Sequence, residues 1–417
     1  MKNKKAIYLL FAANSISGVS QGISMIAIPW YIANDLGLPS VYGLLYLGIT
    51  ILSIFWGTYA GTLIDKYDRK RIMQGIQSVG FFIVLFSAIY GFIIKDTTLW
   101  MASIVMIATK LIYNIHYPNL YAFAQEITEK EHYGRITSWL EIQGQTTFAI
   151  AGAMAGFLME GKFFKWQFSA WKVHEIFMLD ASTYVLALIL ISLISYTSLA
   201  ERKLTNTTFI SRLKGGLTYL KENPLVFIFG VAASFLFAAI LVSSFFILPI
   251  YIKKFMNGSE SIFAFSEGVF ALGSLLSGIF VLSIFPKNKL VASIIFMSII
   301  GALFFFLFGR SNMILLLLVG YAIIGFCNAG IRILRTTYIF NIIPNDIIGR
   351  TGSVFMVINM LFRIVLIGLF SIPFFNKGDN IKYSMMILGV FVLSGTLVLI
   401  ANYRKLAKMN PENEKVN

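Results

Sequence analysis

Seven ionisable residues lie inside long apolar stretches of this sequence of 417 residues. Burying a charge in the hydrocarbon of a membrane costs about 2.5–3.5 kcal/mol or more, so these side chains should face the interior of a helix bundle. There an acid can carry a proton across the membrane, and a base can bind polar groups of a transported molecule. The seven are Lys110, Glu141, Asp180, Glu267, Arg332, Arg335 and Arg363.

The three acids, Glu141, Asp180 and Glu267, are candidates for coupling transport to protons. A proton-coupling acid must bind a proton on one side of the membrane and release it on the other. The structural alternative is an ion pair with a neighbouring helix, because buried charges in membrane proteins commonly pair with one another. Both interpretations stay open for all three acids.

Several polar residues form stripes along single helix faces. At 100° per residue, the members of the stripes in the predicted spans 99–125 and 313–340 fall within about 40° of the first residue of each stripe, and the span at 6–33 carries a similar stripe. We interpret the stripes as the lining of a cargo cavity; the alternative is hydrogen bonding between helices away from any cargo. With Arg363, the residues assigned to the cavity are Asn14, Ser17, Gln21, Lys110, Asn114, Tyr117, Asn328 and Arg332. Such a cavity would be basic and would suit an amphipathic cargo with acidic or hydrogen-bonding groups.

The elements that position these residues are membrane-spanning helices. Hydrophobic residues make up 58% of the chain and charged residues 13%, against about 25% charged in a soluble domain. A helix needs about 20 apolar residues to cross a bilayer, and such stretches recur along nearly the whole chain. Apolar length and polar breaks predict twelve spans, at 6–33, 41–63, 72–94, 99–125, 136–158, 174–197, 225–251, 261–284, 290–308, 313–340, 351–375 and 382–402.

Lysine and arginine predict the orientation. With the N-terminus inside, 21 of them lie on the cytoplasmic side, nine on the other side and four within spans. This bias places both termini in the cytoplasm. The net charge of +15 is then explained by topology and by attraction to lipid, without nucleic acid as a partner. The single cysteine and the three scattered histidines predict neither a disulfide nor a metal site.

Internal repetition divides the chain into two halves. Residues 29–32, Pro-Trp-Tyr-Ile, match residues 249–252, Pro-Ile-Tyr-Ile, and the pairs Gly134-Arg135 and Gly349-Arg350 each precede a span. We predict an N-terminal six-helix half at 1–197, a cytoplasmic linker with an amphipathic helix at 198–224, a C-terminal half at 225–403 and a tail at 404–417. Two parallel halves with a site between them are typical of transporters.

The sharpest motif is the loop after the second span, residues 61–71, Gly-Thr-Leu-Ile-Asp-Lys-Tyr-Asp-Arg-Lys-Arg. It resembles the cytoplasmic loop signature of the major facilitator superfamily. The resemblance implies a cytoplasmic gate in which Gly61 allows close approach to the eleventh span, Asp65 faces the N-terminal end of that span, and Arg69 pairs with an acid near the fourth span. Glu126 is the expected partner. The alternative is a basic loop that only follows the positive-inside rule.

Within that superfamily, the chain resembles the bacterial branch of macrolide efflux proteins and the enterobactin exporter. The resemblance rests on the loop, on Phe177 to Tyr184 in the sixth span, on Asn223-Pro224 after the linker, and on Gly349 to Val354. It implies an all-helical integral membrane protein in the bacterial plasma membrane, with twelve helices in two six-helix halves around a central cavity. It also implies proton-driven export of a macrolide-like drug, a siderophore or a similar molecule.

Other classes of protein are weighed against this interpretation. No phosphate-binding Gly-x-x-x-x-Gly-Lys-Ser/Thr sequence is present, which argues against an ATP-driven pump, and no cluster of catalytic residues predicts an enzyme. No cofactor is expected beyond the proton gradient, and we expect one chain to be the functional unit. A non-transporting sensor of the same fold, an importer and a lipid flippase remain alternatives.

Overall fold

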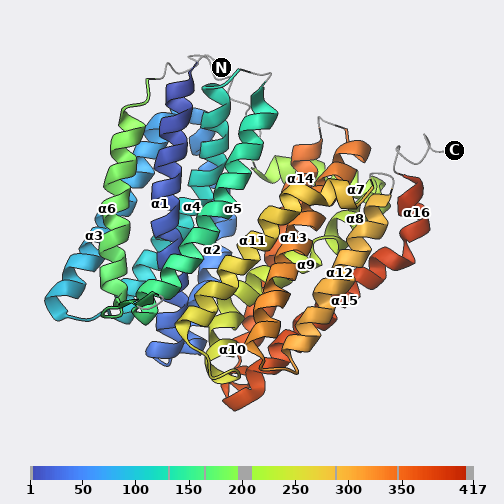
Figure 1. The fold of residues 1–417 in the computed structure, drawn as a ribbon. Coiled ribbons are helices and arrows are strands. Elements are labelled where there is room, and N and C mark those ends of the chain that lie inside the picture. Colours follow the sequence, from blue (N-terminus) through green and yellow to red (C-terminus); the bar gives the residue numbers. More distant parts are fainter. Residues whose placement is uncertain are drawn as a thin grey trace. The chain divides into compact units, whose positions relative to one another are not determined.

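The computed structural model describes residues 3–129, 132–163, 166–195, 209–286, 289–344 and 347–409. They form two compact units built almost entirely from long helices (Figure 1). Unit 1 is Met1–Thr205 with Ser259–Gly268, and unit 2 is Asn206–Gly258 with Val269–Asn417.

Unit 1 contains the first six long helices and one small pair of strands. Strands β1 (Lys162–Phe163) and β2 (Trp166–Gln167) pair antiparallel, a detail that the sequence did not predict. The helical elements are α1 (Lys4–Trp30), the π-helix η1 (Tyr31–Asp35), α2 (Pro39–Lys66), α3 (Arg69–Ile94), α4 (Leu99–Glu126), α5 (Tyr133–Glu160) and α6 (Val173–Ser192).

Unit 2 holds the linker helix and the second set of spans, and helix α11 begins in unit 1 and continues into unit 2. Its elements are α7 (Phe209–Glu222), α8 (Pro224–Ala232), α9 (Phe235–Val242), the π-helix η3 (Ser243–Ile247), α10 (Leu248–Lys254), α11 (Glu260–Ile284), α12 (Leu290–Phe308), α13 (Ile314–Ile342), α14 (Ile348–Phe370), the short 3-10 helices η5 (Pro373–Asn376) and η6 (Gly378–Asn380), α15 (Ile381–Ala401) and α16 (Tyr403–Lys408).

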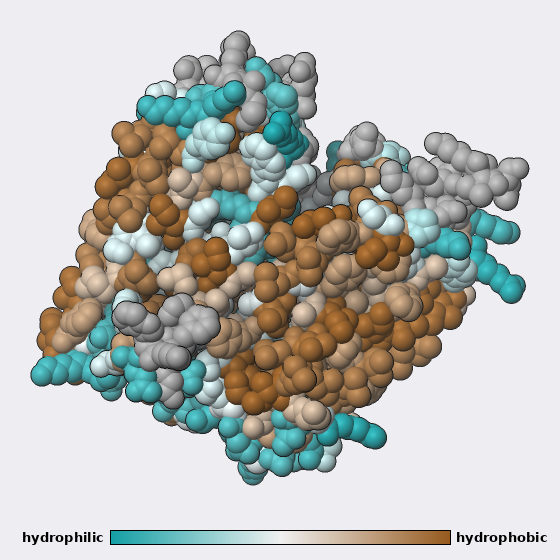
Figure 2. Space-filling model, in the orientation of Figure 1, coloured by the Kyte–Doolittle hydropathy of each residue, from teal (hydrophilic) through white to brown (hydrophobic). Residues whose placement is uncertain are grey.

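The predicted spans coincide with these helices. Among the described residues, eleven helical segments are long and apolar enough to cross a membrane. The remaining predicted span, the fifth at 136–158, is helix α5, which has 28 residues but is less apolar and is not one of the eleven. Large apolar side chains cover the outward sides of the helices in each unit, and hydrophilic residues gather at helix ends (Figure 2). That distribution is expected where lipid replaces water around a bundle.

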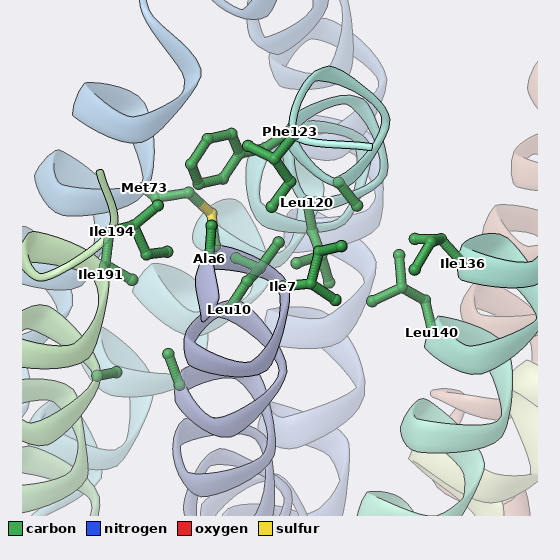
Figure 3. Packing of buried hydrophobic residues seen from close by; sticks show 14 residues of the cluster. Ala6, Ile7, Leu10, Met73, Leu120, Phe123, Ile136, Leu140, Ile191 and Ile194 are labelled. Atoms are coloured by element: carbon green, nitrogen blue, oxygen red, sulfur yellow. The ribbon is translucent and has the colours of Figure 1, made fainter. Parts of the chain in front are cut away.

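The core of unit 1 at its N-terminal end shows how the helices are held together. Ala6, Ile7 and Leu10 of α1 pack against Leu120 and Phe123 of α4 (Figure 3). Side chains of α3, α5 and α6 complete the same cluster, which includes Met73, Ile136, Leu140, Ile191 and Ile194. Because five helices share it, this cluster fixes the relative positions of α1 and α4, the two helices that carry polar stripes.

The seventh predicted span is interrupted rather than continuous. Helix α8 ends at Ala232, and α9 begins at Phe235 after a turn at Ala233 and Ser234. The Ser234 carbonyl accepts a hydrogen bond from the Ala238 backbone N–H, at 3.0 Å, and a second one from the buried amide of Asn359 in α14, at 3.4 Å. Asn359 therefore ties α14 to the break between α8 and α9.

The repeated tyrosines make equivalent hydrogen bonds in the two units. Tyr31 donates to the carbonyl of Thr97, in the connection between α3 and α4. Tyr251 donates to the carbonyl of Phe308, at 2.7 Å, at the end of α12 and before α13. Each tyrosine therefore anchors the junction between the third and fourth spans of its half, as expected for two related halves.

The linker helix α7 packs against unit 2. Its Leu220 is buried with Val226, Ile343 and Val354, whereas Leu217 is 44% exposed. A Cβ atom added to Gly216 would lie 2.4 Å from the carbonyl oxygen of Arg350, so α7 lies directly against the start of α14. An amphipathic helix is thus present at the predicted linker, and of its leucines Leu213 and Leu220 pack inside the unit whereas Leu217 lies outside.

Candidate functional site

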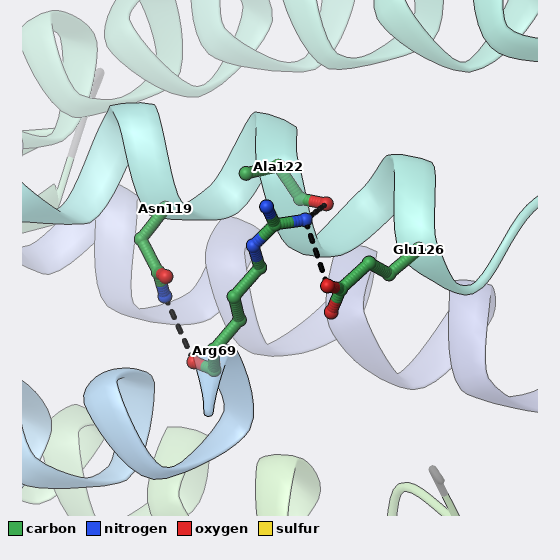
Figure 4. A network of polar contacts seen from close by, with 4 residues as sticks. All are labelled: Arg69, Asn119, Ala122 and Glu126. Atoms are coloured by element: carbon green, nitrogen blue, oxygen red, sulfur yellow. Dashed lines mark hydrogen bonds and ion pairs between the residues drawn. The ribbon is translucent and has the colours of Figure 1, made fainter. Parts of the chain in front are cut away.

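The predicted loop motif contains an ion pair between α3 and α4. Arg69 Nη1 lies 3.0 Å from Glu126 Oε1 and donates to the carbonyl of Ala122, at 2.7 Å (Figure 4). The Arg69 and Glu126 side chains are 19% and 6% exposed, so the pair is largely out of water. The predicted pairing of Arg69 with Glu126 is present, and its role in gating stays a prediction.

Local structure places Arg69 for this pairing. Asp68 caps α3 by accepting a hydrogen bond from the Arg71 backbone N–H, at 2.9 Å, so the helix begins at Arg69. Asn119 of α4 is fully buried and donates to the Arg69 carbonyl, at 2.9 Å (Figure 4). Asp68, which departs from the glycine of the family pattern, therefore has a structural use here.

The rest of the predicted gate is less defined. Gly61 lies within α2, and its predicted approach to the eleventh span would join the two units. Asp65 lies in the same helix, and its side chain falls outside the described part of the structure. Both roles stay predictions.

Asp180 is the most enclosed of the three candidate acids. It lies in α6, is fully buried, and accepts a hydrogen bond from Ser24 of α1 at 2.8 Å. Close by, Gln21 donates to the Tyr184 hydroxyl, at 3.2 Å. Within the described residues, Asp180 has no cationic partner, and its Oδ1 accepts no hydrogen bond. The ion-pair interpretation of Asp180 therefore has no support in this part of the chain.

The other two acids differ from Asp180 and from each other. Glu141 is exposed on α5 and accepts a hydrogen bond from Tyr121 of α4, at 2.7 Å, which corrects the expectation that it is buried. Glu267 is buried in the part of α11 that belongs to unit 1. Their proton-coupling roles stay predictions.

A polar network joins the stripe of α1 to α4 and α5. Asn14 donates from Nδ2 to Gln143 Oε1, at 3.1 Å, and its Oδ1 lies 2.8 Å from His116 Nε2. Gln143 Nε2 donates to the carbonyl of Phe11 and to the hydroxyl of Ser15. Sequence reasoning missed His116 and Gln143. Their distance from the helix ends could have identified them. Asn14 lies ten residues after the start of α1, His116 ten residues before the end of α4, and Gln143 ten residues after the start of α5.

The α4 stripe is partly assembled in unit 1. Lys110 Nζ lies over the ring of Tyr46 from α2, 5.9 Å from its centroid. Tyr117 packs on Tyr113, with ring centroids 4.4 Å apart, and Asn114 Nδ2 has no hydrogen-bond partner among the described residues. Ser17 and Gln21 continue the α1 stripe beyond Asn14, with Ser17 buried and Gln21 directed to α6.

The unit 2 candidates are more dispersed. Asn328 and Arg363 are half-buried on α13 and α14, and Arg332 is exposed on α13. A buried polar contact of unit 2 lies between Ser243 of η3 and Tyr321 of α13, whose hydroxyl oxygens are 2.8 Å apart. The cavity roles of Asn328, Arg332 and Arg363 stay predictions. Among the described residues, no group of three metal-ligating side chains occurs.

Comparisons with known proteins agree with the fold. The model of the Major Facilitator Superfamily matches residues 10–367. Macrolide efflux protein A of Streptococcus pyogenes is 24% identical over 410 residues, which cover 95% of this chain and 94% of that protein. Among solved structures, the D-xylose-proton symporter has a TM-score of 0.71 at 14% identity, with 94% of this chain and 97% of that chain covered. A bacterial homologue of the iron transporter ferroportin, in an inward-facing state, also has a TM-score of 0.71 at 15% identity, with coverage of 96% and 98%.

Proposed function

The chain belongs to the Major Facilitator Superfamily, and from this premise we propose that it is a secondary active transporter that exports an amphiphilic small molecule in exchange for protons. The observation that carries the proposal is the similarity to Macrolide efflux protein A along nearly the full length of both chains. A macrolide-like amphiphile is therefore the first cargo to test, followed by siderophores.

Asp180 is the proposed proton carrier. It lies in α6 and is fully buried. The single hydrogen bond of its carboxyl group in the described structure comes from the neutral hydroxyl of Ser24 in α1. A charged carboxylate without a cation is costly in this environment, whereas a protonated one is not. Proton exchange at Asp180 would then accompany the change between conformations that open to either side of the membrane.

The Arg69–Glu126 pair is proposed as part of the cytoplasmic gate. Both partners lie within unit 1, so the pair fixes the start of α3 to the end of α4. In the proposed mechanism, this pair holds the loop before α3 in place when the cytoplasmic side is closed. With both termini in the cytoplasm, the positive charges of this loop lie on the side that the positive-inside rule favours.

A sensitivity screen tests the proposal in cells. Cells that express the protein, the Asp180→Asn variant or no protein would be exposed to macrolides, siderophores and amphiphilic peptides, with membrane levels of both forms matched. We expect protection against at least one cargo by the unmodified protein and not by the variant. Equal sensitivity of all three strains to the whole panel would contradict export and would favour a sensor of the same fold.

A further inference from the structure

In the hydrogen-bond network of Asn14, His116 and Gln143, one backbone carbonyl determines which atom donates and which accepts in each bond. The carbonyl of Phe11 can only accept, so the Gln143 atom that meets it must be the amide nitrogen. Gln143 Oε1 then accepts from Asn14 Nδ2, and Asn14 Oδ1 faces His116 Nε2 at 2.8 Å. Since Asn14 Oδ1 is also only an acceptor, His116 Nε2 must carry a hydrogen.

The consequence falls on the other ring nitrogen of His116. A neutral imidazole with hydrogen on Nε2 has a lone pair on Nδ1, which is then a hydrogen-bond acceptor. His116 is 8% exposed, and no carboxylate contacts it in the described structure, so a charged ring would be costly here. Among the described residues, His116 Nδ1 has no hydrogen-bond partner.

The surroundings of His116 suit the apolar part of an amphiphile. The Tyr117 ring meets the imidazole edge-on, with centroids 5.3 Å apart, and packs on Tyr113, which is 47% exposed. His116 lies ten residues before the end of α4 at Glu126. At a rise of 1.5 Å per residue this separation is about 15 Å, which is half the thickness of a hydrocarbon core of about 30 Å. The acceptor therefore lies near the middle of the membrane, beside a tyrosine pair.

We propose that His116 Nδ1 accepts a hydrogen bond from a hydroxyl group of the cargo, while Tyr113 and Tyr117 contact its apolar part. The cargo class is thus a hydroxyl-bearing amphiphile. A cationic amine of the cargo would require a carboxylate partner, which His116 does not supply, so the group that meets Nδ1 is a hydroxyl even in a cargo that carries an amine elsewhere. This inference rests on the proposed transport function and adds to it the chemical group that determines affinity. A purely structural network would need Nε2 alone, because that nitrogen already joins α4 to α1.

The His116→Gln variant separates the two roles. The glutamine amide can still donate to Asn14 Oδ1, but the ring acceptor is lost. The probes are erythromycin and a derivative with its hydroxyl groups methylated, measured in proteoliposomes. We expect the KM for erythromycin to rise about tenfold, as for one lost hydrogen bond, with Vmax nearly unchanged and with no change for the methylated probe. An unchanged KM for erythromycin, or an equal loss for both probes, would overturn the proposal.

A second measurement does not depend on transport. In protein labelled with ¹⁵N-histidine, the ring signals report which nitrogen carries hydrogen, and His116→Gln identifies the His116 signals among the three histidines. We expect hydrogen on Nε2 without cargo, and a shift of the Nδ1 signal when erythromycin is added. If the unmodified protein transports neither probe, the proposed export is refuted. The titration still tests whether erythromycin binds at His116 Nδ1. A shift at Nδ1 would support the site, and hydrogen on Nδ1 or the absence of a shift would refute it.

Discussion

Two buried acids of unit 1 are stabilised in different ways, and the difference separates their roles. Glu126 pairs with Arg69 at 3.0 Å, so its charge is balanced within the fold. Asp180 is equally enclosed but has only Ser24 as a described hydrogen-bond donor. A carboxylate paired with a cation is suited to a structural contact between helices. A carboxyl group without a cationic partner is suited to binding and releasing a proton.

Asp180→Asn tests the second role. Asparagine has nearly the same shape and can still accept from Ser24, so we expect the melting temperature to change little. The flux driven by a pH gradient should fall by about tenfold or more, while exchange of cargo without a gradient should persist. Glu141→Gln is the matched control, because Glu141 is exposed. Gradient-driven flux that survives Asp180→Asn and fails with Glu141→Gln would reverse the assignment.

A double-mutant cycle tests the Arg69–Glu126 lock. Arg69→Ala removes the guanidinium that lies 3.0 Å from Glu126, and Glu126→Gln removes the carboxylate charge that faces Arg69, which keeps its bond to the Ala122 carbonyl. We expect a coupling free energy of about 1–3 kcal/mol in detergent unfolding, because the two side chains are in direct contact. Arg71→Ala, an exposed neighbour in the same loop, should change stability by less than about 0.5 kcal/mol. Additive single effects would mean that the pair contributes no interaction energy.

At this scale the sequence predicted residue types better than contacts. The loop motif led to the Arg69–Glu126 pair because the family that it resembles pairs this arginine with an acid near the fourth span. The contacts of Ser24 with Asp180 and of Asn14 with His116 could not be predicted, because the sequence does not reveal which faces of different helices meet. Glu141 was expected inside the bundle and is exposed, since apolar length defines a helix but not the side that faces its neighbours.

Among the helices of unit 1, α5 crosses the first part of α11 with its backbone in close contact. A Cβ atom added to Gly152 would lie 2.8 Å from the Ala264 carbonyl oxygen and from the Gly268 nitrogen, both in the first part of α11. Nothing lies within 4 Å of the same position on Gly144, two turns earlier. Small residues therefore set this crossing, as the concentration of glycine and alanine in α5 suggests.

Gly152→Ala and Gly144→Ala form a matched pair for this crossing. We expect Gly152→Ala to destabilise the protein by about 1–3 kcal/mol, because backbone atoms on α11 must move. Gly144→Ala should be neutral or stabilising by up to about 1 kcal/mol, since alanine favours the helix. Thermal unfolding in detergent measures both. Equal effects of the two substitutions would show that the crossing tolerates a methyl group.

The repeated tyrosines allow a comparison between the halves. Tyr31→Phe and Tyr251→Phe each remove a hydroxyl that bonds a loop carbonyl. We expect each to cost about 1 kcal/mol of stability, with nearly additive effects in the double variant, because the two residues lie in different units. Chemical unfolding followed by tryptophan fluorescence gives the three values. A strong deviation from additivity would contradict independent anchoring of the two junctions.

Element positions were the best predicted part of the fold, because crossing a bilayer demands long apolar runs. The break between α8 and α9 was not predicted, because the sequence there stays apolar. Asn359, which donates a hydrogen bond to the Ser234 carbonyl at the break, lies far along the chain in α14. The packing of α7 on α14 was also missed. It depends on Gly216 lying against Arg350, a contact between segments more than a hundred residues apart.

For the whole molecule, family membership and full-length similarity to an efflux protein lead to one central claim. We propose that the protein moves an amphiphilic cargo outward while protons move inward through Asp180. Purified protein in liposomes with an acidic lumen tests this directly, with erythromycin outside and a pH-sensitive dye inside. Erythromycin is a weak base that an acidic lumen traps, so protein-free liposomes and the Asp180→Asn variant are needed as controls.

The account predicts that erythromycin enters faster than in both controls, that the lumen becomes less acidic as it enters, and that collapsing the gradient abolishes the difference. Erythromycin entry equal to that of the controls, or entry through the protein that is insensitive to the gradient, would contradict it.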